Sequence, residues 1–129
     1  MIKIKKMEPY RDTEKGSDRA FSTRDTGYIV VLHRNKGFVS GKHYHKGKST
    51  SKSPEILYLV KGRIRIITKD IETGETEEHE ASDNSLIEIP SGIYHEVHHL
   101  TDTIILELCT SEEDFKAQDT LNSQSNLEI

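Results

Sequence analysis

Hydrophobic and polar residues alternate over short stretches in the middle of the chain. Residues 63–68 read R-I-R-I-I-T, and the neighbouring apolar runs are equally short and rich in β-branched residues. Gly, Pro, Asn and Asp separate these runs, and residues 72–75 have the composition of a hairpin turn. Short strands at this spacing predict an all-β barrel or sandwich. The strands are expected over 28–33, 55–60, 63–68, 76–80, 85–89, 94–100 and 103–108.

The two ends of the chain are more polar than this central region. Near the start, Ile2 and Ile4 alternate with lysines, which is a short strand signal. Near the other end, Ser111 is followed three residues later by Asp114, which resembles a capping box and predicts a short helix over 111–118. We expect a single domain in three parts: a polar N-terminal segment (1–27), a core (about 28–110) and a tail (111–129) whose residues 122–129 are frayed.

The composition narrows the classes of function. Only 33% of the residues are hydrophobic and 31% are charged, which suits a barrel with one apolar inner face. The net charge of −4 gives no electrostatic support to nucleic-acid binding. A single cysteine, Cys109, excludes an intramolecular disulfide framework and fits a reducing compartment. The basic start MIKIKK has no apolar segment after it, and no stretch is long enough to cross a membrane. We therefore expect a soluble cytoplasmic protein without nucleic-acid or membrane partners.

Residues 40–50, SGKHYHKGKST, contain two candidate motifs. The G-K-S at 47–49 resembles the end of a phosphate-binding P-loop, but Gly41 lies one residue too far upstream. The residues that follow are polar and end at Pro54, where a P-loop would begin a helix. Residues 46–54 are therefore predicted to be an exposed loop.

The other motif is the pair His43 and His45. Residues two apart on a strand point to the same face, so the two imidazoles form a natural two-point clamp for a metal ion. Glu55 begins the next apolar run, and His95 lies on a later one, directly after the turn P-S-G at 90–92.

Together these spacings resemble the two motifs of the cupin superfamily. The chain reads G-x5-H-x-H from residue 37 to 45, E-x6-G from 55 to 62 and P-x-G-x2-H from 90 to 95. The resemblance covers about residues 37–99 and departs from the family in three places. Nine residues separate His45 from Glu55 where the family has three or four, so the loop is enlarged. Asn84 and His99 stand where the second motif has Gly and Asn, and Asn also tolerates left-handed turn geometry.

The resemblance implies a cupin-type double-stranded β-helix (jelly-roll) barrel in which His43, His45, Glu55 and His95 converge. Three imidazoles and a carboxylate would hold one divalent metal ion, with Mn, Fe, Ni and Zn all open, and would leave coordination positions free. The alternative is a hydrogen-bonded cluster without metal. His43 or His95 would be the catalytic base. His99 shares the inward direction of His95 and would lie behind the site or face the substrate.

Residues 87–119 look loosely similar to the carboxy-terminal half of cupins that isomerise nucleotide-linked keto-sugars. This resemblance predicts a metal-binding enzyme that isomerises or epimerises a sugar or a nucleotide-linked keto-sugar. Two alternatives stay open, a metal-dependent dioxygenase of a small organic acid and a non-catalytic module that binds a sugar or metabolite.

Other residues suggest partners. Lys46, Lys48 and Lys52 in the enlarged loop would attract an anionic sugar as point charges, unless the loop is only solvated. A homodimer is expected because small barrels leave strand edges that invite pairing. Glu107 would be a candidate base if it pointed inward, and Cys109 is expected to be structural. The remaining histidines are expected at the surface: His33, His79 and His98.

Overall fold

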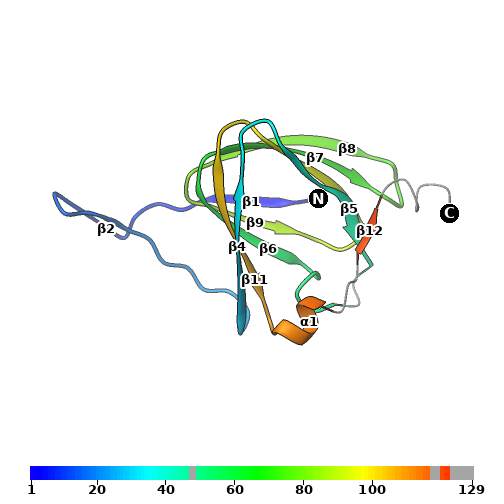
Figure 1. Cartoon of the computed structure of the whole chain (residues 1–129), viewed down its shortest axis with the longest axis horizontal. Coiled ribbons are helices and arrows are strands. Elements are labelled where there is room, and N and C mark those ends of the chain that lie inside the picture. Colours follow the sequence, from blue (N-terminus) through cyan, green and yellow to red (C-terminus); the bar gives the residue numbers. More distant parts are fainter. Residues whose placement is uncertain (47–48, 117–119, 123–129) are drawn as a thin grey trace.

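The computed structural model describes residues 1–46, 49–116 and 120–122. Two five-stranded antiparallel sheets face each other, with strand orders β1-β9-β6-β11-β4 and β12-β5-β10-β7-β8 (Figure 1). The first sheet consists of β1 (Lys3–Lys6), β9 (Ser85–Ile89), β6 (Glu55–Lys61), β11 (Thr103–Cys109) and β4 (Tyr28–Arg34). The second consists of β12 (Thr120–Asn122), β5 (Val39–His45), β10 (Ile93–His99), β7 (Arg63–Asp70) and β8 (Thr76–Ser82). One helix, α1 (Glu112–Lys116), follows β11.

This arrangement confirms the predicted all-β jelly-roll barrel with a short C-terminal helix. Each strand expected from the alternating pattern is present, with its ends shifted by a few residues. The helix begins where the capping box placed it, because the Asp114 amide donates to the Ser111 hydroxyl over 3.0 Å. The positions 117–118 at its expected end, and 123–129 of the expected frayed tail, lie outside the described residues. The expectation is wrong for Asn122, which ends β12 and pairs with His43 of β5.

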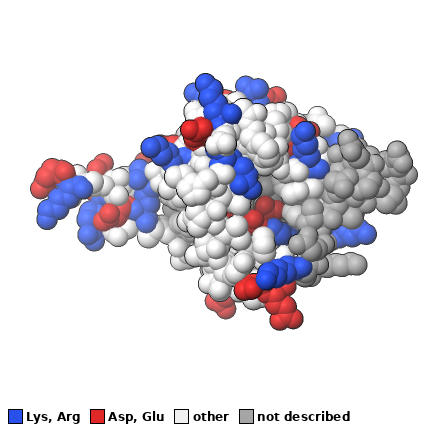
Figure 2. All heavy atoms as spheres, viewed as in Figure 1, with Lys and Arg blue, Asp and Glu red and all other residues white. Residues whose placement is uncertain are grey.

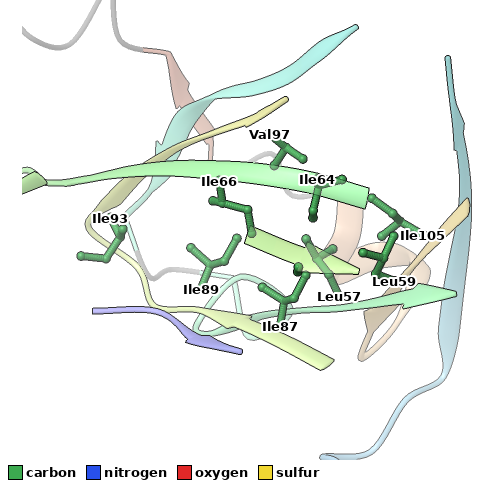
Figure 3. Close-up of a cluster of buried hydrophobic side chains, with 10 residues drawn as sticks. Leu57, Leu59, Ile64, Ile66, Ile87, Ile89, Ile93, Val97 and Ile105 are labelled. Atoms are coloured by element: carbon green, nitrogen blue, oxygen red, sulfur yellow. The ribbon is translucent and has the colours of Figure 1, made fainter. Parts of the chain in front are cut away.

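The core lies between the two sheets and is filled mainly by isoleucine and leucine (Figure 3). On β7, Ile64 and Ile66 are fully buried while Arg63 and Arg65 are exposed, as the alternation predicts. Side chains from both sheets point toward one another in this cluster, which explains how a chain with few apolar residues closes a barrel. The buried cluster comprises Leu57, Leu59, Ile64, Ile66, Ala81, Ile87, Ile89, Ile93, Val97 and Ile105.

The N-terminal segment is more ordered than the sequence suggested. Strand β1 pairs with β9 of the same chain, placing Ile4 opposite Ile87. The next residues form a hairpin of β2 (Arg11–Thr13) and β3 (Gly16–Asp18), which extends away from the barrel in Figure 1. Its residues are all exposed and show no apolar alternation, so the sequence pattern could not reveal it. The homodimer stays a prediction.

Charges of both signs lie on the face of the molecule that Figure 2 shows. On the face drawn in Figure 2, basic and acidic side chains of the described residues are interspersed, so this face lacks the basic patch that nucleic-acid binding needs. No helix within the described ranges has the length and apolar character required to cross a membrane.

Candidate metal centre and its cavity

The structure brings His43, His45, Glu55 and His95 together across the two sheets. The two histidines of the H-x-H motif lie on β5, and His95 lies directly opposite His43 on β10. Glu55 reaches the group from the other sheet, at the first residue of β6. One potential ligand atom from each residue lies within 4.8 Å of the others. The motif therefore predicted the spatial arrangement, while metal binding itself stays a prediction.

Gly41 allows β5 to approach β10 this closely. It has a left-handed φ of 83°, and a Cβ atom at this position would lie 2.8 Å from the His95 carbonyl oxygen. The pairing of β5 with β10 changes register next to His95, so the irregularity sits beside the histidine cluster. A glycine in this place satisfies both the backbone angle and the close contact.

Hydrogen bonds orient the cluster. His45 Nε2 lies 2.7 Å from Glu55 Oε2. The Nδ1–H of His95 donates to the Ile93 carbonyl oxygen over 3.0 Å, because a carbonyl can only accept. The Nε2 of His95 is then the unprotonated nitrogen, and it faces Glu55 Oε2 at 3.9 Å. A backbone carbonyl that fixes the tautomer in this way is typical of metal-ligating histidines.

Burial and the neighbouring groups together determine the protonation states of His43, His95 and Glu55. Burial, assisted by the neighbouring His95, lowers the pKa of His43 to about 4. Burial also lowers the pKa of His95. For Glu55, burial alone would raise the pKa, but the hydrogen bond from His45 and the nearby His95 and Lys52 outweigh it and hold the pKa well below its usual range.

The donor set fits a divalent cation. Near neutral pH His43 and His95 are neutral and Glu55 is a carboxylate, and these are the protonation states that bind metal. A buried carboxylate surrounded by imidazoles gains most from a cation placed among them. Nitrogen donors with one carboxylate suit Mn, Fe, Ni or Zn.

The lowered pKa of His43 makes the stability of the metal-stripped protein depend on pH. Between pH 6.5 and 4 the unfolded chain binds more protons at this residue than the folded chain, so acidification lowers the free energy of unfolding. The expected loss from this residue is on the order of 3 kcal/mol. Urea denaturation at pH 7 and pH 4 should show it in the chelated wild type and show a smaller loss in His43→Gln. Equal losses in the two proteins would contradict the assignment.

A cavity of about 280 Å³ lies against the cluster. Residues of β4, β5, β6, β10, β11, α1 and the loop before β6 line it, so both sheets contribute to its wall. Its volume is at the small end of the range for small-molecule sites. The polar lining residues are Arg34, Ser40, His43, His45, Lys52, Glu55, His95 and Glu107, and the others are Val30, Leu32, Gly41, Leu57, Val97, Ile105 and Phe115.

The prediction of an exposed loop over 46–54 is wrong for three of its described residues. Ser49, Ser51 and Lys52 are buried, while Lys46 is exposed. The Lys52 ammonium reaches into the cavity, where it forms an ion pair with the Glu107 carboxylate. Lys52 is therefore not a solvated charge at the mouth of the barrel, and Lys48 lies outside the described residues.

We call residues 49–54 the inner loop. Two residues that are distant in the sequence, Arg24 and Asp114, hold its backbone against the barrel. The Arg24 guanidinium donates to the carbonyl oxygens of Thr50, Ser51 and Pro54 over 2.6–2.8 Å, and to that of Leu108 over 3.1 Å. From the other end of the chain, the Asp114 carboxylate accepts from the Ser49 hydroxyl and from the amides of Thr50 and Ser51. These bonds replace the water that an exposed loop would use.

The other candidate residues are also placed. Glu107 points into the cavity, which was the condition for its being a candidate base. His99 is buried between the Ser40 and Thr103 hydroxyls, each 2.8 Å from a ring nitrogen, and it does not line the cavity. Cys109 is fully buried, and burial together with Glu107 raises the pKa of its thiol to about 11, which fits a structural role.

The surface histidines were predicted correctly. His33 is exposed, and His79 and His98 are partly exposed. Each of the last two contacts a glutamate on its own strand, Glu77 at 3.1 Å and Glu96 at 3.0 Å. None of the three lines the cavity.

The chain belongs to the polysaccharide biosynthesis C-terminal domain family, whose sequence model matches residues 15–121. No curated protein matches the sequence. Among solved structures, the chain is similar to a 3,4-ketoisomerase from Helicobacter canadensis, with a TM-score of 0.76 and 16% identity over 98% of this chain and 93% of that one. It is also similar to dTDP-4-dehydrorhamnose 3,5-epimerase from Sulfolobus tokodaii, with a TM-score of 0.69 and 21% identity over 85% and 70%.

A third similar structure is the capsular polysaccharide assembling protein CapF from Staphylococcus aureus. The TM-score is 0.63 and the identity 24%, over 85% of this chain but only 30% of that one. At these identities the likenesses establish the fold, and they confirm the predicted cupin-type barrel as a fold.

Proposed function

We propose that this chain is a metal-dependent enzyme that isomerises or epimerises a sugar, with a nucleotide-linked keto-sugar as substrate. The observation that carries the proposal is the group of three imidazoles and one carboxylate in the wall of a cavity. The family to which the chain belongs is named for polysaccharide biosynthesis. Support also comes from the solved relatives, one of which is a 3,4-ketoisomerase in complex with TDP-4-keto-6-deoxyglucose.

The four residues divide into two roles. His45, Glu55 and His95 are buried, and two histidines with one carboxylate are a common donor set for a divalent ion. The ion, when bound, acts as a Lewis acid that polarises the substrate carbonyl. His43 is only partly buried and lines the cavity, so it is the residue that a substrate can reach.

His43 performs the proton transfer in this proposal. Moving a keto group or inverting a neighbouring carbon requires a base that removes a proton next to the carbonyl. The lowered pKa keeps the His43 imidazole unprotonated at neutral pH, so it can accept that proton and return it to the adjacent carbon on the same face. Inversion of a carbon would need a second proton donor on the opposite face of the ring. The surrounding leucine, valine and isoleucine side chains exclude water from the transfer.

Proton exchange in heavy water tests the function. Metal-loaded wild type, incubated with TDP-4-keto-6-deoxyglucose in D₂O, should incorporate deuterium next to the carbonyl, as seen by NMR. His43→Gln should lose the exchange but keep its metal, whereas His95→Gln should lose both. His79→Gln, which changes a partly exposed histidine outside the cavity, serves as the matched control.

Other outcomes would separate the alternatives. Binding of the keto-sugar without exchange would make the chain a non-catalytic module. Full deuterium exchange by the chelated protein would refute the dependence of the reaction on a metal ion. If the protein does not bind the nucleotide-linked sugar, the proposed substrate is wrong.

A further inference from the structure

The Lys52–Glu107 ion pair is a second polar feature of the cavity wall that the proton transfer does not use. Both side chains are about nine-tenths buried, and both line the cavity together with His43 and Glu55. They come from different elements, Lys52 from the inner loop and Glu107 from β11. The ring of Phe115 lies 5.0 Å from the ammonium and covers it on one side.

The pair has hydrogen-bonding capacity left over. An ammonium carries three N–H donors, and among the described residues Glu107 is the hydrogen-bond partner of Lys52. Glu107 uses Oε2 for this contact, and no described residue donates to its Oε1. Glu107 Oε1 is not fully buried, and because Glu107 lines the cavity, a ligand in the cavity can contact this oxygen. The cavity therefore presents an ammonium donor and a carboxyl acceptor side by side.

Stability alone gives a weak reason for this pair. Removing two charges from water costs more than their attraction returns in many buried pairs, and apolar replacements are often neutral or stabilising. The Glu55 and Glu107 carboxylates outweigh the effect of burial and raise the pKa of Lys52, so the ammonium is charged at neutral pH. A charged pair kept in a cavity wall is instead suited to binding a polar ligand, because hydrogen bonds to ionised groups are the stronger ones.

Both partners are held in fixed positions. Glu107 lies on a central strand, paired with Val30 of β4 on one side and Leu57 of β6 on the other. Lys52 is fixed by the inner loop, whose backbone is bound by Arg24 and Asp114. A ligand would meet a preorganised donor and acceptor, which lowers the entropy lost on binding.

We propose that Lys52 and Glu107 bind two neighbouring hydroxyl oxygens of the sugar and orient its ring against His43. Lys52 donates to one oxygen, and Glu107 accepts the hydroxyl hydrogen of the next. Adjacent hydroxyls are the common feature of sugars, and each can both donate and accept. The inference rests on the proposed function, whose substrate class it specifies further.

A double apolar variant tests the pair without leaving a lone buried charge. Lys52→Met combined with Glu107→Leu should fold, keep the wild-type metal content and raise KM for TDP-4-keto-6-deoxyglucose at least tenfold. The matched control is Arg65→Met with Glu78→Leu, which removes an exposed pair on the outer faces of β7 and β8 and should leave KM unchanged. An unchanged KM in the Lys52/Glu107 double variant would overturn the inference.

Thermal unfolding of the ligand-free proteins provides a second test that needs no substrate. If wild type neither binds nor turns over the keto-sugar, the proposed function fails, and the melting temperature of the ligand-free proteins decides about the pair. A melting temperature equal to or above that of wild type supports a pair kept for a ligand. A fall of about 5 °C or more would show that the pair is structural and overturn the inference.

Discussion

The Glu55→Gln protein should bind its divalent ion at least about a hundredfold more weakly than wild type. Replacing residues that merely support a ligand already costs ten- to a hundredfold, and Glu55 supplies the one carboxylate among the four clustered residues. An amide keeps the volume of the carboxylate and can still hydrogen-bond to His45, so the fold should persist. Competition with a chelator for Zn²⁺ at neutral pH measures the change.

Glu80→Gln is the control for this experiment, since Glu80 is exposed on β8 and lies outside the cavity. It removes the same charge from the chain and should leave the affinity unaltered. If Glu55→Gln binds the ion with wild-type affinity, Glu55 is not a metal ligand. That result would favour the hydrogen-bonded cluster without metal.

Arg24→Ala should lower the free energy of unfolding by about 3 kcal/mol or more. The guanidinium donates to four carbonyl oxygens, and a hydrogen bond to a charged group contributes about 1.5–3 kcal/mol. Its loss leaves part-buried carbonyls of the inner loop unpaired. Urea denaturation measures the loss of stability, and hydrogen exchange should become faster in residues 49–54.

Two further variants sharpen this result. Arg24→Lys should recover only part of the stability, because an ammonium donates from one point and cannot span four acceptors. Arg11→Ala removes an exposed arginine of the hairpin, 3.4 Å from Asp18, and should change stability by no more than about 0.5 kcal/mol. Similar losses for Arg24→Ala and Arg11→Ala would show that the inner loop does not depend on Arg24.

The sequence was informative wherever the pattern is local. Alternation on β7 predicted which residues are buried, since Ile64 and Ile66 follow the period of a strand. Ser111 and Asp114 predicted the helix start because a capping box lies within one turn. The spacing of the histidine motif worked for a similar reason, because two residues on one strand share a face.

The inner loop could not be predicted because its partners are distant in the sequence. Its serines and lysine have the composition of an exposed loop, and nothing within a few residues indicates burial. The contacts that hold it involve Arg24, 26 to 30 residues upstream, and Asp114, 63 to 65 residues downstream. The local pattern therefore predicts an exposed Lys52 and does not reveal its pairing with Glu107.

The inner loop also constrains the order in which the domain can assemble. As the chain is synthesised, residues 49–54 leave the ribosome long before their downstream partners exist. Lys52 must wait for Glu107, 55 residues later, and the loop backbone must wait for Asp114. Most of the barrel can pair while this wall is still open, so the surface that meets a ligand can be completed only when synthesis has passed residue 114. Contacts of such long range close slowly, which leaves a nascent or refolding barrel with an unfinished cavity.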